Sequence, residues 1–242
     1  MKLLFVADLH YTLKQFDWLH ARAGDFDAVV IGGDLLELAG ALDIDTQIVV
    51  VEKYLTRLAQ RTRLLVSSGN HDGDARNAAN ESVCRWLRDA KQDNLYVDGD
   101  CVEMGDTLVT ICPWWDGPET QAEVLSLLER DSTKARTKWI WIYHAPPASS
   151  PVCWNGRKAA GDECLSEWIT RFGPDIVLCG HIHNAPFYKD GSWIDQLGKT
   201  WVFNPGKQIG PVPTYLILDL DQSQVQWSSL EDELTRTIAI TA

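Results

Sequence analysis

The sequence lacks any apolar run long enough to cross a membrane as a helix. Such a helix needs about 18 or more mostly apolar residues, and no stretch of the 242 residues approaches that length. The apolar start of the chain is interrupted at Asp8, too early for the core of a secretion signal. We therefore expect a cytoplasmic protein that does not associate with membranes.

Paired cysteines and an excess of positive charge are also missing. The six cysteines include no Cys-x-x-Cys pair, which favours free thiols in a reducing compartment. The formal net charge is −12, and an acidic surface repels polyanions, so nucleic acid polymers are disfavoured as partners. A local positive site, most simply made by metal ions, can still bind a small anion.

The composition is that of a globular chain with a substantial core. Hydrophobic residues make up 45% and charged residues 23%, and there is no internal repeat, low-complexity tract or interdomain linker. We predict a single α/β domain over residues 1–242 and leave its oligomeric state open.

Short apolar runs alternate with amphipathic patterns along most of the chain. Runs that are apolar at nearly every position are typical of strands buried on both faces. The predicted strands are Lys2–Ala7, Ala28–Ile31, Arg63–Ser67, Leu108–Cys112, Lys138–Tyr143, Asp175–Cys179, Trp201–Asn204 and Tyr215–Leu220. The predicted helices are Leu13–Ala23, Asp43–Gln60, Asn77–Lys91, Pro118–Arg130 and Asp162–Phe172. Val97–Cys101 predicts a tight hairpin.

Five of these strands end directly before residue types that bind metals. The segments are Asp8-Leu9-His10, Gly33-Asp34, Gly69-Asn70-His71-Asp72, His144, and Gly180-His181-Ile182-His183. Open α/β sheets bind ligands at the carboxyl ends of their strands. Two of the segments contain pairs of alternate residues, Asp8/His10 and His181/His183. Alternate residues of an extended segment point the same way, so each pair can face one site. Only His20 lies outside the pattern, and its place in a predicted amphipathic helix indicates a surface histidine.

The donor types point to divalent metal ions. Carboxylate, amide and imidazole ligands suit Mn, Fe, Co or Zn. Seven donors are too many for one tetrahedral ion and about right for two ions that share a bridge. Taken alone, each motif has an ordinary explanation: a chance pair, a turn, a turn before a helix cap or a single zinc site. Their occurrence in this order, each at a strand end, favours one common site.

Together these motifs resemble the signature of the calcineurin-like metallophosphoesterases over about residues 5–206. The resemblance implies a four-layer α/β/β/α sandwich with two central mixed sheets. It also implies a ligand set for two divalent ions (Mn, Fe, Zn or Co): Asp8, His10 and His183 hold one, Asn70, His144 and His181 hold the other, and Asp34 bridges them.

The same resemblance implies a hydrolase in which a metal-bound hydroxide attacks a phosphoester. Two ions can clamp the phosphoryl oxygens and make hydroxide available near neutral pH. His71 would lie beside the phosphate and stabilise the developing charge or protonate the leaving alkoxide. Asp72 is a second candidate catalytic residue if its carboxylate orients His71 by a hydrogen bond. The alternative is that Asp72 caps a helix that follows it.

Departures from better-known branches of the family narrow the substrate class. The two arginines of protein Ser/Thr phosphatases are missing, because Leu35-Leu36-Glu37 follows Asp34 and Ser67-Ser68 precedes Gly69. Glu37 occupies the region of the purple acid phosphatase tyrosine ligand. His71 stands where the lipid-A pathway hydrolases carry arginine. The remaining branch resembles small cytosolic phosphodiesterases and nucleotide phosphatases.

Two loops are candidates for substrate contact. Trp115, in the pair Trp114-Trp115, is placed to stack on a base or else packs in the core. Arg157, beside Lys158, is placed to contact a second phosphate or a ribose, or else lies in a solvated basic loop. We predict a phosphodiesterase for a small phosphoester such as a nucleotide. A phosphomonoesterase with the same metal site and a non-catalytic scaffold of the same fold are the alternatives.

Overall fold

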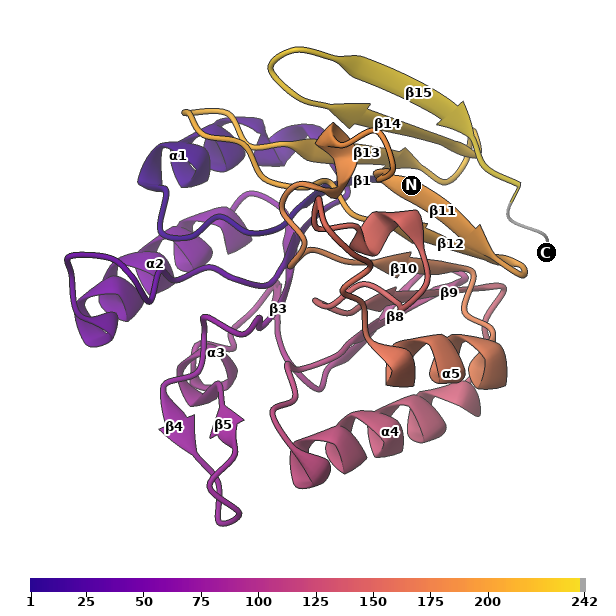
Figure 1. Cartoon of the computed structure of the whole chain (residues 1–242). Coiled ribbons are helices and arrows are strands. Elements are labelled where there is room, and N and C mark those ends of the chain that lie inside the picture. Colours follow the sequence, from indigo (N-terminus) through magenta and orange to yellow (C-terminus); the bar gives the residue numbers. More distant parts are fainter. Residues whose placement is uncertain (240–242) are drawn as a thin grey trace.

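Two mixed sheets lie at the centre of the structure, a computed structural model that describes residues 1–239 (Figure 1). In the seven-stranded sheet, β1, β2, β3 and β6 are parallel, and β13, β14 and β15 continue it in antiparallel order. Its strands, from one edge to the other, are β15 (Glu233–Thr237), β14 (Gln224–Ser228), β13 (Tyr215–Asp219), β1 (Lys2–Val6), β2 (Ala28–Gly32), β3 (Arg63–Ser67) and β6 (Leu95–Tyr96).

The six-stranded sheet has a parallel centre and an antiparallel strand at each edge. Its strands, in order, are β11 (Ile194–Leu197), β12 (Thr200–Phe203), β10 (Ile176–Leu178), β9 (Lys138–Ile142), β8 (Thr107–Ile111) and β7 (Cys101–Met104). Three short 3-10 helices lie in loops: η1 (Ala23–Asp25), η2 (Pro151–Cys153) and η3 (Ala185–Phe187).

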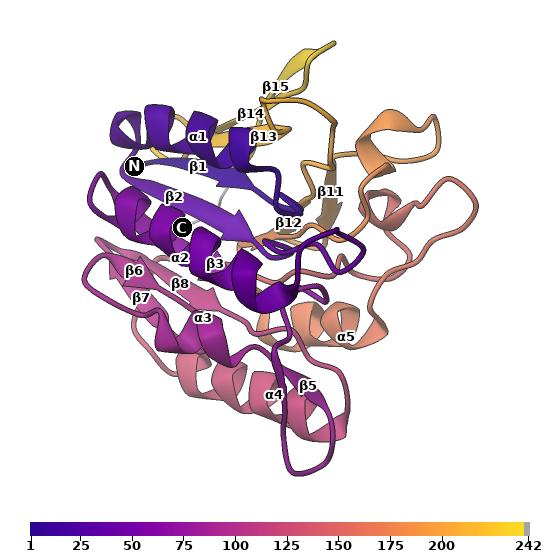
Figure 2. The same cartoon turned by 90° about the vertical axis from the view of Figure 1, so that its left-hand side faces the viewer.

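Helices cover the outer face of each sheet, which gives four layers (Figures 1 and 2). The helices are α1 (Leu13–Arg22) and α2 (Ile44–Ala59) on the first sheet, and α4 (Pro118–Ser132) and α5 (Glu163–Phe172) on the second. Alternate residues of the strands point to opposite faces. In β1, Phe5 therefore packs between the two sheets and Leu4 packs toward the helices. The predicted α/β/β/α sandwich with two mixed sheets is confirmed.

All eight predicted strands and four of the five predicted helices are present, with ends shifted by at most two residues. The prediction of a helix over Asn77–Lys91 is wrong. This segment forms a hairpin, β4 (Ala75–Arg76) and β5 (Ser82–Val83), and only the short helix α3 (Arg85–Asp89). The Asn77 side chain accepts hydrogen bonds from the backbone N–H groups of Ala79 and Glu81, which closes a tight turn instead of starting a helix.

The predicted hairpin at Val97–Cys101 is also wrong. β6 pairs with β3 in the first sheet and β7 pairs with β8 in the second, so this segment crosses between the sheets. Asp98 is buried there and accepts hydrogen bonds from the backbone N–H and the hydroxyl of Ser68. That crossover is held by this polar contact to the loop after β3 and by backbone hydrogen bonds that Gly99 and Asp100 exchange with Ile111 at the end of β8.

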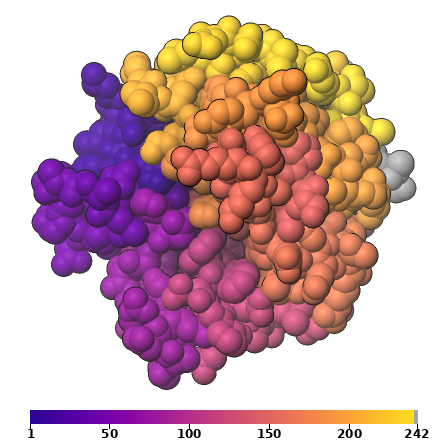
Figure 3. Space-filling model, in the orientation of Figure 1, coloured from indigo at the N-terminus to yellow at the C-terminus, as the bar shows by residue number. Residues whose placement is uncertain are grey.

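The parallel strands of both sheets end at the same side of the molecule. β1, β2 and β3 of one sheet and β9 and β10 of the other run into the loops that carry the predicted metal ligands. Figure 3 shows a hollow near the middle of this face, where purple, pink and orange segments meet. Among the described residues, no helix combines the length and apolarity needed to cross a membrane.

Candidate metal centre

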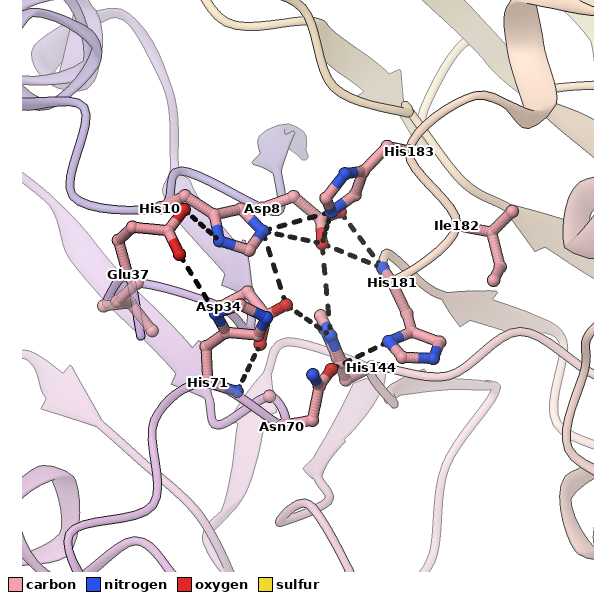
Figure 4. A network of polar contacts seen from close by, with 12 residues as sticks. Asp8, His10, Asp34, Glu37, Asn70, His71, His144, His181, Ile182 and His183 are labelled. Carbon is pink, nitrogen blue, oxygen red and sulfur yellow. Dashed lines mark hydrogen bonds and ion pairs between the residues drawn. The ribbon is translucent and has the colours of Figure 1, made fainter. Parts of the chain in front are cut away.

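The loops that follow five parallel strands bring the seven predicted ligands together (Figure 4). Several of these residues have left-handed backbone conformations, with φ of 57° at Asp8, 42° at His10, 54° at Asp34 and 67° at His181. Non-glycine residues adopt positive φ at a cost, and such strain gathers at functional sites. The pairs Asp8/His10 and His181/His183 do face one site, but through these turns and not through an extended segment.

One group of donors comes from both sheets and comprises Asp8, His10, Asp34 and His183. The Nε2 atoms of His10 and His183 lie 3.1 Å apart. His10 Nε2 is 3.4 Å from Asp34 Oδ2, and His183 Nε2 is 3.4 Å from Asp8 Oδ1. Bonds of about 2.1 Å to one ion place neighbouring ligand atoms about 3.0–3.4 Å apart. The spacing of this group therefore suits a single divalent ion.

A second group comprises Asp34, His144 and His181, with Asn70 beside it. His144 Nε2 lies 3.3 Å from Asp34 Oδ2. His181 Nδ1 lies 2.8 Å from Asn70 Oδ1. Asp34 belongs to both groups, as the prediction that it bridges two ions requires.

The hydrogen bonding of His144 indicates that the site is suited to hold a metal ion. Its Nδ1–H donates to the carbonyl of Gly32 at 2.6 Å, which leaves the lone pair of Nε2 directed into the site. Within residues 1–239 this buried Nε2 has no hydrogen-bond partner. A buried polar atom without a partner is costly, and a cation at that position would satisfy it. The donor set of carboxylates, amide and imidazoles fits divalent ions of the Mn-to-Zn series.

The pKa values of the histidines reflect the burial and charge of the site. Burial lowers the pKa of His10 and of His181 to about 4, so both are neutral, as ligands must be. Burial by itself would also lower the pKa of His144. The charge of the Asp34 carboxylate outweighs this effect and raises the pKa of His144 to about 9. Against the upward effect of its own burial, Asp34 has a pKa well below the usual range because of His144. Without metal these two groups form an ion pair.

Asp72 has neither of the two roles expected for it. Its carboxylate accepts three backbone N–H groups, from Leu35 (2.8 Å), Leu36 (3.0 Å) and Gly69 (2.8 Å). No helix follows it, and its hydrogen bonds do not reach the ring of His71 within the described part of the chain. Burial and then the charge of Asp34 raise the pKa of Asp72 to about 8. Asp72 joins the loop after β2 to the loop after β3 and so holds Asp34 and Asn70 in place.

His71 lies at the mouth of the site. Its backbone N–H donates to Asp34 Oδ1 at 2.9 Å, and its ring packs edge-on against His10 with centroids 4.5 Å apart. The side chain is about a quarter exposed (24%), so solvent or a substrate can reach it.

Two charged residues near the site were not predicted. Glu37 Oε2 lies 3.4 Å from His10 Nδ1, and Glu37 Oε1 lies 3.6 Å from His71 Nδ1. Lys207 is half-buried, and its backbone N–H donates to the carbonyl of His183 at 2.9 Å. Burial lowers the pKa of Lys207, and the carboxylates of the site oppose that effect. In the sequence, two features could have indicated that these residues lie near the site. Glu37 is close to Asp34, and Lys207 directly follows Asn204-Pro205-Gly206, which is typical of a turn.

The two loop tryptophans are both half-buried beside the site, with different contacts. The Trp114 ring lies against the ligands, 5.5 Å from the ring of His181 and 5.7 Å from that of His144. Trp115 instead donates its indole N–H to the hydroxyl of Tyr143 at 2.6 Å. Trp115 is nevertheless half-buried and lines the same cavity as Trp114 and His181, so its contact with a substrate stays a prediction.

Arg157 lies on an exposed turn closed by Asn155, whose side chain accepts the backbone N–H of Arg157 at 3.0 Å. In residues 1–239 its guanidinium makes no hydrogen bond or ion pair to the residues of the site. Its contact with substrate stays a prediction.

Solved structures with the same fold have little sequence in common with this chain. TT1561 of Thermus thermophilus is 15% identical over 98% of this chain and 99% of its own, with a TM-score of 0.61. Purple acid phosphatase PPD1 from yellow lupin is 14% identical over 97% of this chain and 53% of its own, with a TM-score of 0.58. A hypothetical protein from Thermus thermophilus is 13% identical over 99% and 100%, with a TM-score of 0.51. Curated proteins gave no match.

The family is decided by the sequence match. The family model of the calcineurin-like phosphoesterases matches residues 1–185, well over half of the chain. This range contains all seven predicted metal ligands and His71. The chain therefore belongs to the calcineurin-like phosphoesterase family and is a metal-dependent phosphoester hydrolase.

Proposed function

We propose that this chain is a two-ion phosphodiesterase that acts on a small phosphoester such as a nucleotide. The observation that carries the proposal is that Asp34 belongs to two adjacent donor groups. Asp8, His10, Asp34 and His183 would hold one ion, and Asp34, Asn70, His144 and His181 the other. Manganese is our first choice among the ions that suit these donors, which include iron, zinc and cobalt.

The protein's own groups would orient the ester and supply a proton. When bound, two divalent ions supply Lewis-acid chemistry that polarises phosphoryl oxygens and acidifies water. The backbone N–H of Leu38 lies 3.4 Å from His71 Nδ1 and donates to it. In the neutral ring the proton of His71 is then on Nε2, from which it can pass to the oxygen of the leaving group.

A cavity beside the metal centre supports a diester as the substrate. It has a volume of about 520 Å³ and is lined by Trp114, Ala145, Asp162 and His181, among others. A diester has a second organic group that can occupy this space, whereas a monoester has none. The described residues that line the cavity include no lysine or arginine but do include Asp116, Asp162 and Glu163, so it offers no cationic site for a second phosphate.

Hydrolysis of two nitrophenyl esters tests the proposal. We expect the Mn-loaded protein to hydrolyse bis-p-nitrophenyl phosphate with a higher kcat/KM than p-nitrophenyl phosphate, and Asp34→Asn to abolish both activities. Trp114→Ala should lower kcat/KM for the diester about 10-fold and leave the monoester nearly unchanged, since stacking on a ring contributes about 1–3 kcal/mol.

The other outcomes decide between the alternatives. Faster turnover of the monoester would favour the phosphomonoesterase. No turnover of either ester by protein that binds two ions would favour the non-catalytic scaffold.

A further inference from the structure

Glu37 lies between two histidines of the site and has no part in the mechanism described so far. One carboxylate oxygen, Oε2, is 3.4 Å from His10 Nδ1, and the other, Oε1, is 3.6 Å from His71 Nδ1 (Figure 4). The three side chains form a donor group of their own at the edge of the metal centre. His10 Nδ1 is buried, and within residues 1–239 it has no hydrogen-bond partner.

The loop around Glu37 is fixed so that its carboxylate points into the site. The backbone N–H of Glu37 donates to Gln47 Oε1 at 2.8 Å, and Gln47 Nε2 donates to the carbonyl of Glu37 at 2.9 Å. Gln47 is itself buried on α2. The backbone N–H of Ala39 donates to Glu37 Oε1 at 3.0 Å, which leaves Oε2 free to face His10.

This arrangement bears on which nitrogen of His10 carries the proton. A neutral imidazole has one N–H and one lone pair. His10 Nε2 faces Asp34 and His183, where a metal needs the lone pair. A carboxylate beside Nδ1 favours the tautomer with Nδ1–H, and such carboxylate–histidine pairs commonly orient metal ligands in proteins.

We propose that Glu37 is a positioning residue that sets the tautomer of His10 and thereby the affinity of the metal position formed by Asp8, His10, Asp34 and His183. The inference rests on the proposed two-ion site. The second position, with Asn70, His144 and His181, has no contact with Glu37 among the described residues and is linked to it only through the shared Asp34, so its affinity should depend much less on Glu37. His144 has its own tautomer fixed by the carbonyl of Gly32.

Metal titration of Glu37→Gln tests this inference. In a calorimetric titration of metal-depleted protein with Mn²⁺, we expect two binding events in the wild type. In Glu37→Gln, one event weakens about 10-fold to 100-fold and the other changes much less, as for loss of a partner that orients a ligand of one position. The glutamine keeps the size of the side chain and an acceptor for Ala39, so the loop retains its anchor. Glu103→Gln, an exposed glutamate on β7, is the matched control and should bind both ions as the wild type does.

Nitrogen NMR of the histidine rings gives a readout independent of activity and of metal. In metal-depleted wild type, Asp34 Oδ2 lies 3.4 Å from Nε2 and competes with Glu37 for the ring proton, so we expect His10 to populate both tautomers. Glu37→Gln should shift the ring toward the Nε2–H tautomer, because an amide holds the Nδ1 proton less strongly than a carboxylate. A circular-dichroism melt of each variant checks that it is folded.

Each outcome separates the inference from the proposed function. A stoichiometry of one ion per chain in the wild type contradicts the two-ion site itself. Two events in the wild type with unchanged affinities or an unchanged tautomer in Glu37→Gln overturn the role of Glu37 alone. Equal weakening of both events also overturns it. A third event that disappears in Glu37→Gln would make Glu37 a direct ligand and not a positioning residue.

Discussion

At the scale of single residues, His144 shows how a buried side chain is prepared to bind a cation. Its Nδ1–H is held by the carbonyl of Gly32, and its Nε2 faces Asp34 without a hydrogen-bond partner among the described residues. Without metal, the pair of His144 and Asp34 binds a proton instead. Metal and proton therefore compete for the same atom.

This competition predicts a pH dependence of metal binding. Since the pKa of His144 is raised to about 9 without metal, the protonated form prevails below that pH and must lose its proton when a metal binds. Metal affinity should therefore rise about 10-fold per pH unit up to about pH 9 from this proton alone. Calorimetric Mn²⁺ titrations in buffers of different ionisation enthalpy measure both the affinity and the protons released. An affinity independent of pH, without proton release, would contradict the assignment.

Lys207 is the basic residue expected to meet the anionic ester. It is half-buried next to His183 and is influenced by the charges of Asp8, Glu37 and Asp34. Lys207→Ala should lower kcat/KM for a phosphodiester about 10-fold, because a charge-assisted hydrogen bond contributes about 1.5–3 kcal/mol. The matched control is Lys189→Ala, an exposed lysine, which should leave kcat/KM unchanged. Equal effects of both substitutions would mean that Lys207 does not contact the substrate.

At the scale of elements, the sequence was most informative at the ends of strands. Apolar runs marked β1, β2, β3, β9 and β10, and the polar residues after them were predicted to share one edge. The paths of the loops were not predictable, because they depend on left-handed residues such as Asp34 and on side-chain contacts such as that of Gln47 with Glu37. For the same reason the position of Glu37 and the crossover at Asp98 were missed.

Alanine substitutions at Gly33 and Gly99 distinguish the stability cost of backbone strain from that of overpacking at the site. Both have left-handed conformations, with φ of 90° and 86°. A Cβ at Gly33 would lie 2.4 Å from His144 Nδ1, whereas a Cβ at Gly99 would meet no atom within 4 Å. Gly99→Ala should cost about 1 kcal/mol of unfolding free energy. Gly33→Ala should cost about 3 kcal/mol or more and weaken metal binding, since strain and overpacking add. Urea unfolding measures both; equal costs would contradict the packing argument.

At the scale of the whole molecule, the metal centre lies where the two sheets meet. Each donor group takes residues from both: Asp8, His10 and Asp34 follow strands of the seven-stranded sheet, and His144, His181 and His183 follow strands of the six-stranded one. The net charge of the chain is −12 and the site itself contains the carboxylates of Asp8 and Asp34, so a positive centre for an anionic ester depends on bound cations. Ions held in this way would join the sheets as well as bind substrate.

Metal should therefore stabilise the fold. At an Mn²⁺ concentration about 1,000 times Kd, one site adds about 4 kcal/mol, and each kcal/mol raises Tm by about 2–4 °C in a chain of this size. We expect a higher Tm in Mn²⁺ than in EDTA by about 8 °C or more, measured by circular dichroism. Asp34→Asn should lose most of this increase. A Tm unaffected by Mn²⁺ in the wild type would mean that the two sheets are not joined through metal.

The central claim is that two ions share Asp34, and electron paramagnetic resonance of protein loaded with two equivalents of Mn²⁺ tests it most directly. Two ions bridged in this way lie about 3.5–4 Å apart, so their spins should couple and give a multiline spectrum that Asp34→Asn loses. A six-line spectrum of isolated Mn²⁺ from the loaded wild type would contradict the shared site and with it the two-ion account.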